Sequence, residues 1–267
     1  MRIWIAGIMV MAAAGLSAAP EREGWKLVWS DEFDQPGLPD AKKWTNEVGF
    51  VRNREAQYYT RARQENARVE NGTLIIEGRK EEFTARDGKQ SHYTAASLTT
   101  EGLFDLTYGR VEVRAKLPRG RGMWPAIWML GTNIKTVGWP KCGEIDIMEA
   151  VGHEPDTVFA TVHWFGYEKG KHASFGGNLK GQKPADDFHV YAVEWFADRM
   201  DFYYDGAKYF TYPTEKAGTD DKNPFRKPHY LLMNLAIGGG WGGQKGIDET
   251  IFPQQYVIDY VRIYQSR

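Results

Sequence analysis

The feature that most constrains the fold of this chain is a series of short stretches in which apolar and polar residues alternate. In YGRVEVRAKLP, positions 111, 113, 115 and 117 are apolar and positions 110, 112, 114 and 116 are charged. A period of two predicts an antiparallel strand with one face in the core and the other half exposed. Similar runs recur between Gly, Pro, Asn and Asp turns, and Asp205-Gly206 predicts a tight hairpin. The runs are GTLIIEGR, DTVFATVHW, FHVYAVEW, RMDFYYDG, KYFTY, HYLLMNLAI and YVIDYVRIY.

These strands predict an all-β fold, because no stretch after the N-terminal segment has a helical period. Two antiparallel sheets packed as a sandwich or jelly roll would bury the apolar faces of this many strands. The 267 residues include 10 Trp, 14 Tyr and 13 Phe, which is enough for one large core. Gly, Pro and charge are spread evenly without a linker, so we expect a single domain over residues 20–267.

The first residues, MRIWIAGIMVMAAAGLSAAP, have the layout of a secretory signal, which we assign to residues 1–19. Their apolar run is short for a membrane span of about 20 residues, so we predict a secreted or periplasmic protein without stable membrane association. Cys142 is the only cysteine, and we interpret it as a small buried residue rather than a nucleophile. The net charge of −1 and the dispersed basic residues argue against a nucleic-acid partner, and we expect a monomer.

The stretch GEIDIMEA, residues 143–150, carries three acids with an unusual spacing. Glu144 and Asp146 share one face of a strand, but position 148 is Met and the third acid, Glu149, comes one residue later. A β-bulge between Asp146 and Glu149 would absorb one residue and return Glu149 to the face of the other two. On a concave sheet, the side chains of Glu144 and Glu149 could then lean inward until their carboxyls are about 5 Å apart.

A carboxyl pair at that separation is typical of a retaining glycosidase. One carboxylate attacks the anomeric carbon, and the other serves first as acid and then as base. Repulsion and partial burial would raise the pKa of one of the two, while Asp146 lies where it can hydrogen-bond Glu144. Two other interpretations stay open at this point: a solvated acidic face, or three oxygens that hold Ca²⁺.

Aromatic residues near the acids favour a sugar site. Trp124 and Trp128, in GMWPAIWML, lie four apart on one face of a strand, and flat rings can stack on sugars. His163, in HWFG, follows on a strand that can pair with the acidic one. For each of these residues a purely structural role in the core stays open, although ten tryptophans are many for one core.

Together these blocks resemble glycoside hydrolase family 16, in its bacterial laminarinase-like branch. The acids match the family motif Glu-x-Asp-x-x-Glu, and the resemblance runs from LVWSDEFD through NREAQYYT, YGRVEVRAKLPRGRGMWPAIWML and NLAIGGGWGG to YVIDYVRIY. It implies a concanavalin A-like jelly roll with a concave cleft. It also implies endo-acting, retaining hydrolysis of β-1,3 bonds in laminarin-type glucans, extending to mixed-linkage β-1,3-1,4-glucan. Glu144 would be the nucleophile, Asp146 its partner and Glu149 the acid/base.

The resemblance also implies residues that bind substrate and metal. The cleft would be lined by Trp124, Trp128, His163, Asn53 and Trp241. Catalysis would need no cofactor, and a structural Ca²⁺ would lie on the convex side at Glu32, Gly72 and Asp259. Solvated acids near the termini are an equally open interpretation of Glu32 and Asp259.

Two departures from the family pattern bear on the substrate. TAASLTT lacks the arginine that is common near residues 96–98, and GFVRNREAQYYTRAR brings together Arg52, Arg54, Arg61 and Arg63. These arginines form either a solvated loop or a basic rim for a sulfated polysaccharide. An agarase- or carrageenase-like galactan hydrolase is therefore the alternative to a β-glucanase. A non-catalytic β-glucan-binding protein, against which the two glutamates argue, and a metal-dependent enzyme are the remaining alternatives.

Overall fold

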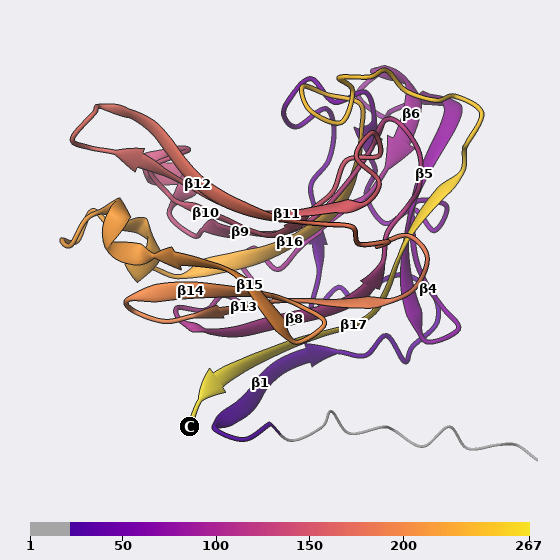
Figure 1. Cartoon of the computed structure of the whole chain (residues 1–267). Coiled ribbons are helices and arrows are strands. Elements are labelled where there is room, and N and C mark those ends of the chain that lie inside the picture. Colours follow the sequence, from indigo (N-terminus) through magenta and orange to yellow (C-terminus); the bar gives the residue numbers. More distant parts are fainter. Residues whose placement is uncertain (1–21) are drawn as a thin grey trace, which may run out of the picture.

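The computed structural model describes residues 22–267, and the predicted signal peptide lies outside them. Two β-sheets pack face to face, as Figure 1 shows. One sheet has seven strands in the order β12-β11-β10-β9-β16-β7-β2, and all its pairs are antiparallel. Its strands are β2 (Thr45–Asn46), β7 (Ser97–Thr99), β9 (Met123–Gly131), β10 (Glu144–Glu149), β11 (Thr157–Gly166), β12 (Lys171–Lys180) and β16 (His229–Ile237).

The other sheet has ten strands, eight of which follow the order β15-β14-β13-β8-β17-β5-β6-β3, while β1 pairs with β17 and β4 with β5. Its one parallel pair joins β3 to β6. The strands are β1 (Trp25–Asp31), β3 (Tyr58–Tyr59), β4 (Ala67–Glu70), β5 (Thr73–Thr84), β6 (Gln90–Ala95), β8 (Gly109–Lys116), β13 (His189–Trp195), β14 (Arg199–Tyr204), β15 (Ala207–Pro213) and β17 (Gln254–Ser266). The helices within residues 22–267 are α1 (Ile134–Val137) and the 3-10 turns η1 (Thr214–Ala217) and η2 (Pro224–Arg226).

The predicted all-β sandwich is confirmed, and its core lies between the sheets. Along β11, Val158, Ala160 and Val162 are buried and the residues between them face the other way. The predicted hairpin is also present, because β14 ends at Tyr204 and β15 begins at Ala207. Asp205 and Gly206 both have positive φ, +48° and +79°, as a two-residue turn between twisted strands requires.

The prediction that the charged face of strand β8 is half exposed is wrong for part of the strand. Its charged face is not half exposed throughout, since Arg110 is 1% exposed and Glu112 is 8% exposed. The reason is that β8 lies inside the sheet, between β13 and β17, and side chains of those strands cover it. Glu194 accepts a hydrogen bond from Arg110, and the Tyr260 hydroxyl donates one to Glu112.

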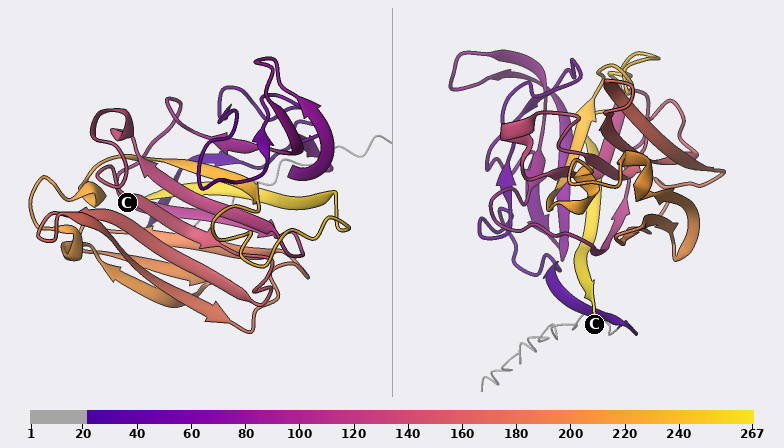
Figure 2. Two further views of the ribbon diagram at one scale, coloured as in Figure 1. Left: turned by 90° about the horizontal axis from the view of Figure 1, so that it is seen from above. Right: turned by 90° about the vertical axis from the view of Figure 1, so that its left-hand side faces the viewer.

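The seven-stranded sheet is curved, and its concave face carries the candidate site. In Figure 1 the loops at both ends of this sheet rise above its middle, and the left view of Figure 2 looks down onto that face. A cleft with a volume of about 730 Å³ lies over β9, β10, β11 and β16. Among residues 22–267, no helix has the length and apolarity needed to cross a membrane.

Candidate active site

The spacing of the acids on β10 is explained by a β-bulge, as the sequence predicted. Against β9, Glu144 pairs with Leu130, Asp146 with Trp128 and Glu149 with Ala126, and the register shifts between Asp146 and Met148. The partner positions 130, 128 and 126 are two apart, so they lie on one face of β9. The bulge therefore places all three acids on the concave face, while Ile145 and Met148 are buried in the core.

The start of β10 is fixed by a glycine. Gly143 has a φ of +80°, and a Cβ there would lie 2.7 Å from Cβ of Pro224. An L-residue side chain would meet both a strained backbone and a steric clash at this position. Gly143 thus allows the chain to turn directly into Glu144.

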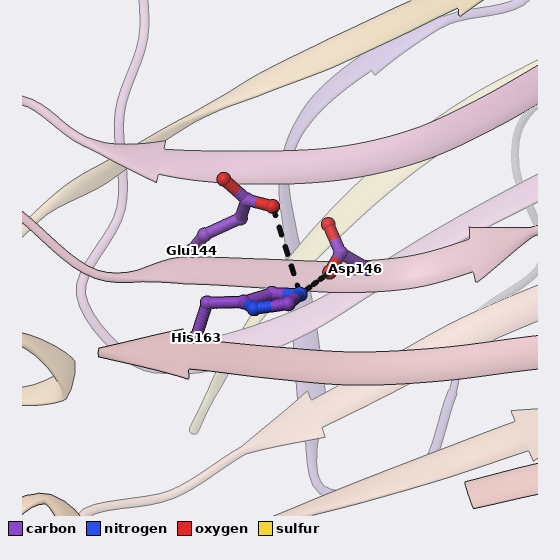
Figure 3. Close-up of side chains that lie close together, drawn as sticks. All are labelled: Glu144, Asp146 and His163. Atoms are coloured by element: carbon purple, nitrogen blue, oxygen red, sulfur yellow. Dashed lines mark ion pairs between the residues drawn. The ribbon is translucent and has the colours of Figure 1, made fainter. Parts of the chain in front are cut away.

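Glu144, Asp146 and His163 form a close group on neighbouring strands, which Figure 3 shows. His163 lies opposite Glu144 in the β10–β11 pair, and its Nε2 is 3.2 Å from Asp146 Oδ2 and 3.9 Å from Glu144 Oε1. Burial raises the pKa of Asp146 well above its usual value, and the charge of Glu144 and a hydrogen bond to it raise the pKa further. Asp146 therefore tends to keep a proton beside the Glu144 carboxylate.

Glu149 lies in a different environment at the other end of the bulge. The indole N–H of Trp124 donates to its Oε1 at 2.9 Å. Burial raises the pKa of Glu149 well above its usual value, the charges of Asp146 and Glu144 add to the rise, and the Trp124 bond and His163 oppose it. A carboxyl with this shift is a suitable proton donor near neutral pH.

All the cleft residues named from the sequence line this cleft: Trp124, Trp128, His163, Asn53 and Trp241. Trp241 packs edge-on against Trp124, with ring centroids 5.5 Å apart, and forms a wall near Glu149. Asn53 donates to Glu55 Oε1 at 3.2 Å from the loop after β2. Trp128 is not a free stacking surface, because it is 6% exposed, donates its indole N–H to Asn234 and lies beneath Arg52.

Several residues of the cleft could not be identified from the sequence. Trp139 is half exposed and its indole N–H donates to Glu144 Oε2 at 2.8 Å. Its position in GWPKCGE, five residues before Glu144, is the signal that could have pointed to it. Glu47, just after β2, and Asn234, on β16, also line the cleft, but both are far from the acids in sequence.

The four arginines do not form a common basic rim. Arg52 lines the cleft, forms an ion pair with Glu47 and lies 4.8 Å from the Trp128 ring centroid. Arg63 binds Glu81 through two hydrogen bonds of 2.6 and 2.9 Å. Arg54 and Arg61 are exposed. Of the four, Arg52 alone lines the cleft, and Glu47 offsets its charge.

The two acids named for Ca²⁺ accept hydrogen bonds from arginines in this structure. Both carboxylate oxygens of Glu32 accept from Arg262, at 2.9 and 2.8 Å, and Asp259 Oδ2 accepts from Arg114 at 2.6 Å. Gly72 lies in the turn between β4 and β5 with a φ of +73°. A cation at Glu32 and Asp259 would have to displace both arginines, and the Ca²⁺ site at these residues stays a prediction.

A possible metal-binding group does occur elsewhere. Within residues 22–267, Glu144, Asp146 and His163 each offer one ligand atom, and these atoms lie within 4.8 Å of one another. A cation prefers ionised carboxylates, whereas the raised pKa of Asp146 favours its protonated form. We therefore derive no catalytic step through a metal.

Cys142, next to this group in sequence, has no part in such chemistry. It is fully buried, and burial together with the nearby Glu144 charge raises its pKa to about 11. A thiol with this pKa stays protonated, and only the thiolate is a nucleophile. The sequence-based interpretation of Cys142 as a buried structural residue is confirmed.

The cleft therefore contains one carboxyl held beside a histidine and an indole, and a second carboxyl that tends to stay protonated. Aromatic walls flank them, and the floor next to them is a small apolar cluster of Ala126, Trp128, Leu130, Cys142, Tyr230 and Leu232. A carboxyl that tends to keep its proton, near a second carboxyl in an aromatic cleft, can support acid–base catalysis and nucleophilic attack on a glycosidic bond.

Comparison with known proteins gives consistent results. Residues 54–262 match the model of glycosyl hydrolases family 16. A β-glucanase of Rhodothermus marinus is 49% identical over 250 residues, which cover 90% of this chain and 85% of the relative. The crystal structure of the laminarinase from Rhodothermus marinus superposes with a TM-score of 0.82 at 47% identity, covering 91% of this chain and 98% of that one.

A complex with sugars is also among the similar structures. LamA of Zobellia galactanivorans, as a variant in complex with laminaritriose and laminaritetraose, superposes with a TM-score of 0.80 at 40% identity. The match covers 90% of this chain and 98% of that chain. Relatives of this chain therefore bind β-glucan oligosaccharides.

Proposed function

The chain belongs to glycosyl hydrolase family 16, and from that premise we infer that it is an endo-1,3(4)-β-glucanase of the laminarinase type. It cleaves internal β-1,3 bonds of laminarin-type glucans, and mixed-linkage β-1,3-1,4-glucan is its second substrate. Retention of configuration follows from the family. The observation that carries the assignment of residues is the bulge in β10, because it places Glu144, Asp146 and Glu149 together on the concave face.

In the first step, we propose that the Glu144 carboxylate attacks the anomeric carbon while Glu149 gives its proton to the glycosidic oxygen. The bond between the anomeric carbon and that oxygen breaks, the shortened glucan leaves as an alcohol, and Glu144 becomes a glycosyl ester. Trp139 and His163 hold the Glu144 end of the site, and Trp124 orients Glu149. Asp146 supports Glu144 through the hydrogen bond between them.

In the second step, Glu149 is ionised and takes a proton from water. The water oxygen attacks the anomeric carbon from the side that the leaving group occupied and releases Glu144 as a carboxylate. Two inversions at the same carbon give overall retention. Glu149 ends protonated and Glu144 ionised, so the enzyme is ready for another turn.

The charge of the cleft favours a neutral glucan over a sulfated galactan. Five acids line it, against one arginine and one histidine: Glu47, Glu55, Glu144, Asp146, Glu149, Arg52 and His163. The Arg52 charge is offset by Glu47. Among the residues that line the cleft, a sulfate group would find no arginine whose charge is unpaired, whereas the hydroxyls of a neutral sugar can hydrogen-bond to the acids.

We further propose that residues 1–19 are removed as a signal peptide, and that residues 20–267 act as one secreted or periplasmic catalytic domain. The supporting observations are the charge and apolar pattern of the first residues and the single two-sheet core of residues 22–267. The glucan polymer is the partner, and we propose that a monomer suffices because one chain supplies the whole cleft.

The function is tested by measuring reducing ends and product sizes on laminarin, mixed-linkage glucan, agarose and κ-carrageenan in parallel. We expect laminarin to shorten rapidly to oligomers, mixed-linkage glucan to follow, and both galactans to stay intact. Cleavage of κ-carrageenan in preference to laminarin would overturn the substrate assignment. Tight binding of laminarin without any release of reducing ends would overturn the enzymatic assignment.

A further inference from the structure

The imidazole of His163 has a second nitrogen, and this atom faces another histidine. His163 Nδ1 lies 2.9 Å from Nε2 of His172 on β12, and the two rings stack with centroids 5.1 Å apart and planes 17° apart. Trp139 covers the pair, since its ring centroid lies 4.8 Å from that of His172. His172 is thus connected through His163 to Asp146 and through Trp139 to Glu144.

The neighbours of His163 restrict where its proton can lie. Asp146 Oδ2 is buried and has no hydrogen-bond partner among residues 22–267, and His163 Nε2 lies 3.2 Å from it. A buried carboxyl oxygen needs a donor, so Nε2 should carry the proton. In a neutral imidazole this leaves a lone pair on Nδ1, which in turn needs a donor.

His172 can supply that donor. A neutral imidazole has one N–H group, and Nε2 of His172 lies 2.9 Å from Nδ1 of His163. Three ionisable groups of β10 act on His163: Glu144 and Asp146 lie near its Nε2, and Glu149 interacts with its charge. The hydrogen-bond partner of Nδ1 is instead Nε2 of His172.

We propose that His172 is a positioning residue for the acids: its Nε2–H donates to Nδ1 of His163 and fixes the tautomer in which His163 donates from Nε2 to Asp146. This inference rests on the proposed role of Glu144 and Asp146 in the cleft. Without His172, His163 can move its proton to Nδ1 and turn a lone pair toward Asp146 Oδ2. Asp146 would then lose the donor that holds it against Glu144, so turnover would fall while sugar binding at Trp124 and Trp241 would not change.

Two substitutions separate the hydrogen bond from the ring stack. His172→Phe keeps a flat ring beneath Trp139 but removes both nitrogens, and His172→Gln keeps a side-chain N–H that can reach His163. We expect H172F to lower kcat on laminarin about tenfold, the effect of losing one hydrogen bond at the site, with KM unchanged. H172Q should recover kcat to within about threefold of the parent enzyme, which a role in stacking alone would not allow. Thermal midpoints of both variants equal to that of the parent enzyme would show that folding is intact.

The tautomer can be observed without substrate. Two-bond nitrogen–proton correlation spectra of the ¹⁵N-labelled parent enzyme should show His163 protonated at Nε2, and H172F should show loss of that pattern. Observation of His163 protonated at Nδ1 alone in the parent enzyme would overturn the inference, as would an H172F variant with the parent kcat. Absence of activity on every glucan with the Nε2 tautomer in place would instead count against the proposed function and leave the role of His172 in tautomer control supported.

Discussion

The two sheets of this molecule arrange buried charge in opposite ways. On the outer face of the ten-stranded sheet, Arg110 lies between Glu112 and Glu194, and Arg262 binds Glu32 through two hydrogen bonds. On the concave face of the seven-stranded sheet, acids are placed next to acids, and the pKa values of Asp146 and Glu149 are raised.

This difference distinguishes charged residues that stabilise the fold from charged residues that serve catalysis. Opposite charges that are paired and hydrogen-bonded keep a buried face compatible with folding, because each compensates for the desolvation of the other. Like charges brought together cost stability, but they shift proton affinity toward the range that catalysis needs. Substitutions on the concave face should therefore change turnover, and substitutions on the outer face should change the free energy of unfolding.

The largest effect is expected for Glu144→Gln. The amide cannot form the glycosyl ester, so kcat on laminarin should fall on the order of 10⁴-fold or more. Laminarin binding, measured by calorimetry, should stay near that of the parent enzyme because the aromatic walls are unchanged. Turnover close to that of the parent enzyme would refute the assignment of Glu144 as nucleophile.

Glu149→Gln should produce a loss that depends on the leaving group. On laminarin the missing proton donor should lower kcat on the order of 10³-fold. The second substrate is an aryl β-laminaribioside whose phenol leaving group is acidic. On this substrate the first step should be largely restored, because that leaving group needs no proton. Equal losses on both substrates would contradict the assignment of Glu149 as general acid.

On the outer face, Arg110→Met should destabilise the fold by about 3 kcal/mol, because Glu112 and Glu194 would lose a buried partner. The matched control is Arg114→Met on the same face of β8, where the side chain is 37% exposed and pairs with Asp259. That substitution should cost about 1 kcal/mol or less. Urea unfolding measures both. A loss of kcat per folded molecule in R110M would contradict the prediction that substitutions on the outer face change stability and not turnover.

The stability of the concave face should depend on pH through Glu149. Its pKa is raised by folding, so its contribution to stability is present at acid pH and is lost as the pH rises through the raised value. Thermal midpoints of the parent enzyme and E149Q should therefore agree best at low pH and diverge as the pH increases, with E149Q the more stable. A gap that narrows with rising pH would contradict the raised pKa.

The smallest effect is expected from removing metal ions. Since no step of the proposed mechanism uses a metal, dialysis against EDTA should leave kcat unchanged. The thermal midpoint tests the Ca²⁺ site predicted at Glu32, Gly72 and Asp259: a decrease that added Ca²⁺ reverses would establish it. Reversible loss of kcat at a constant thermal midpoint would place a functional metal at Glu144, Asp146 and His163 instead.

The sequence alone determined the fold class and the acidic group of the site. Alternation of apolar residues is a local property, so runs such as YVIDYVRIY predict strands without knowledge of their partners. The offset of Glu149 also reflects a local rule, because one extra residue in a strand reverses the face of every residue that follows.

Tertiary structure decided what surrounds these acids and which charges are paired. His172 meets His163 through the pairing of β12 with β11, and Arg52 enters the cleft from the loop after β2. The same holds for Arg110, whose burial follows from the central place of β8 in its sheet. Such contacts depend on strand order and curvature, and distances across a sheet are not encoded in the spacing of residues along one strand. The physical reason is that proton affinity and ion pairing depend on separation and burial in space, which are fixed only when the two sheets pack.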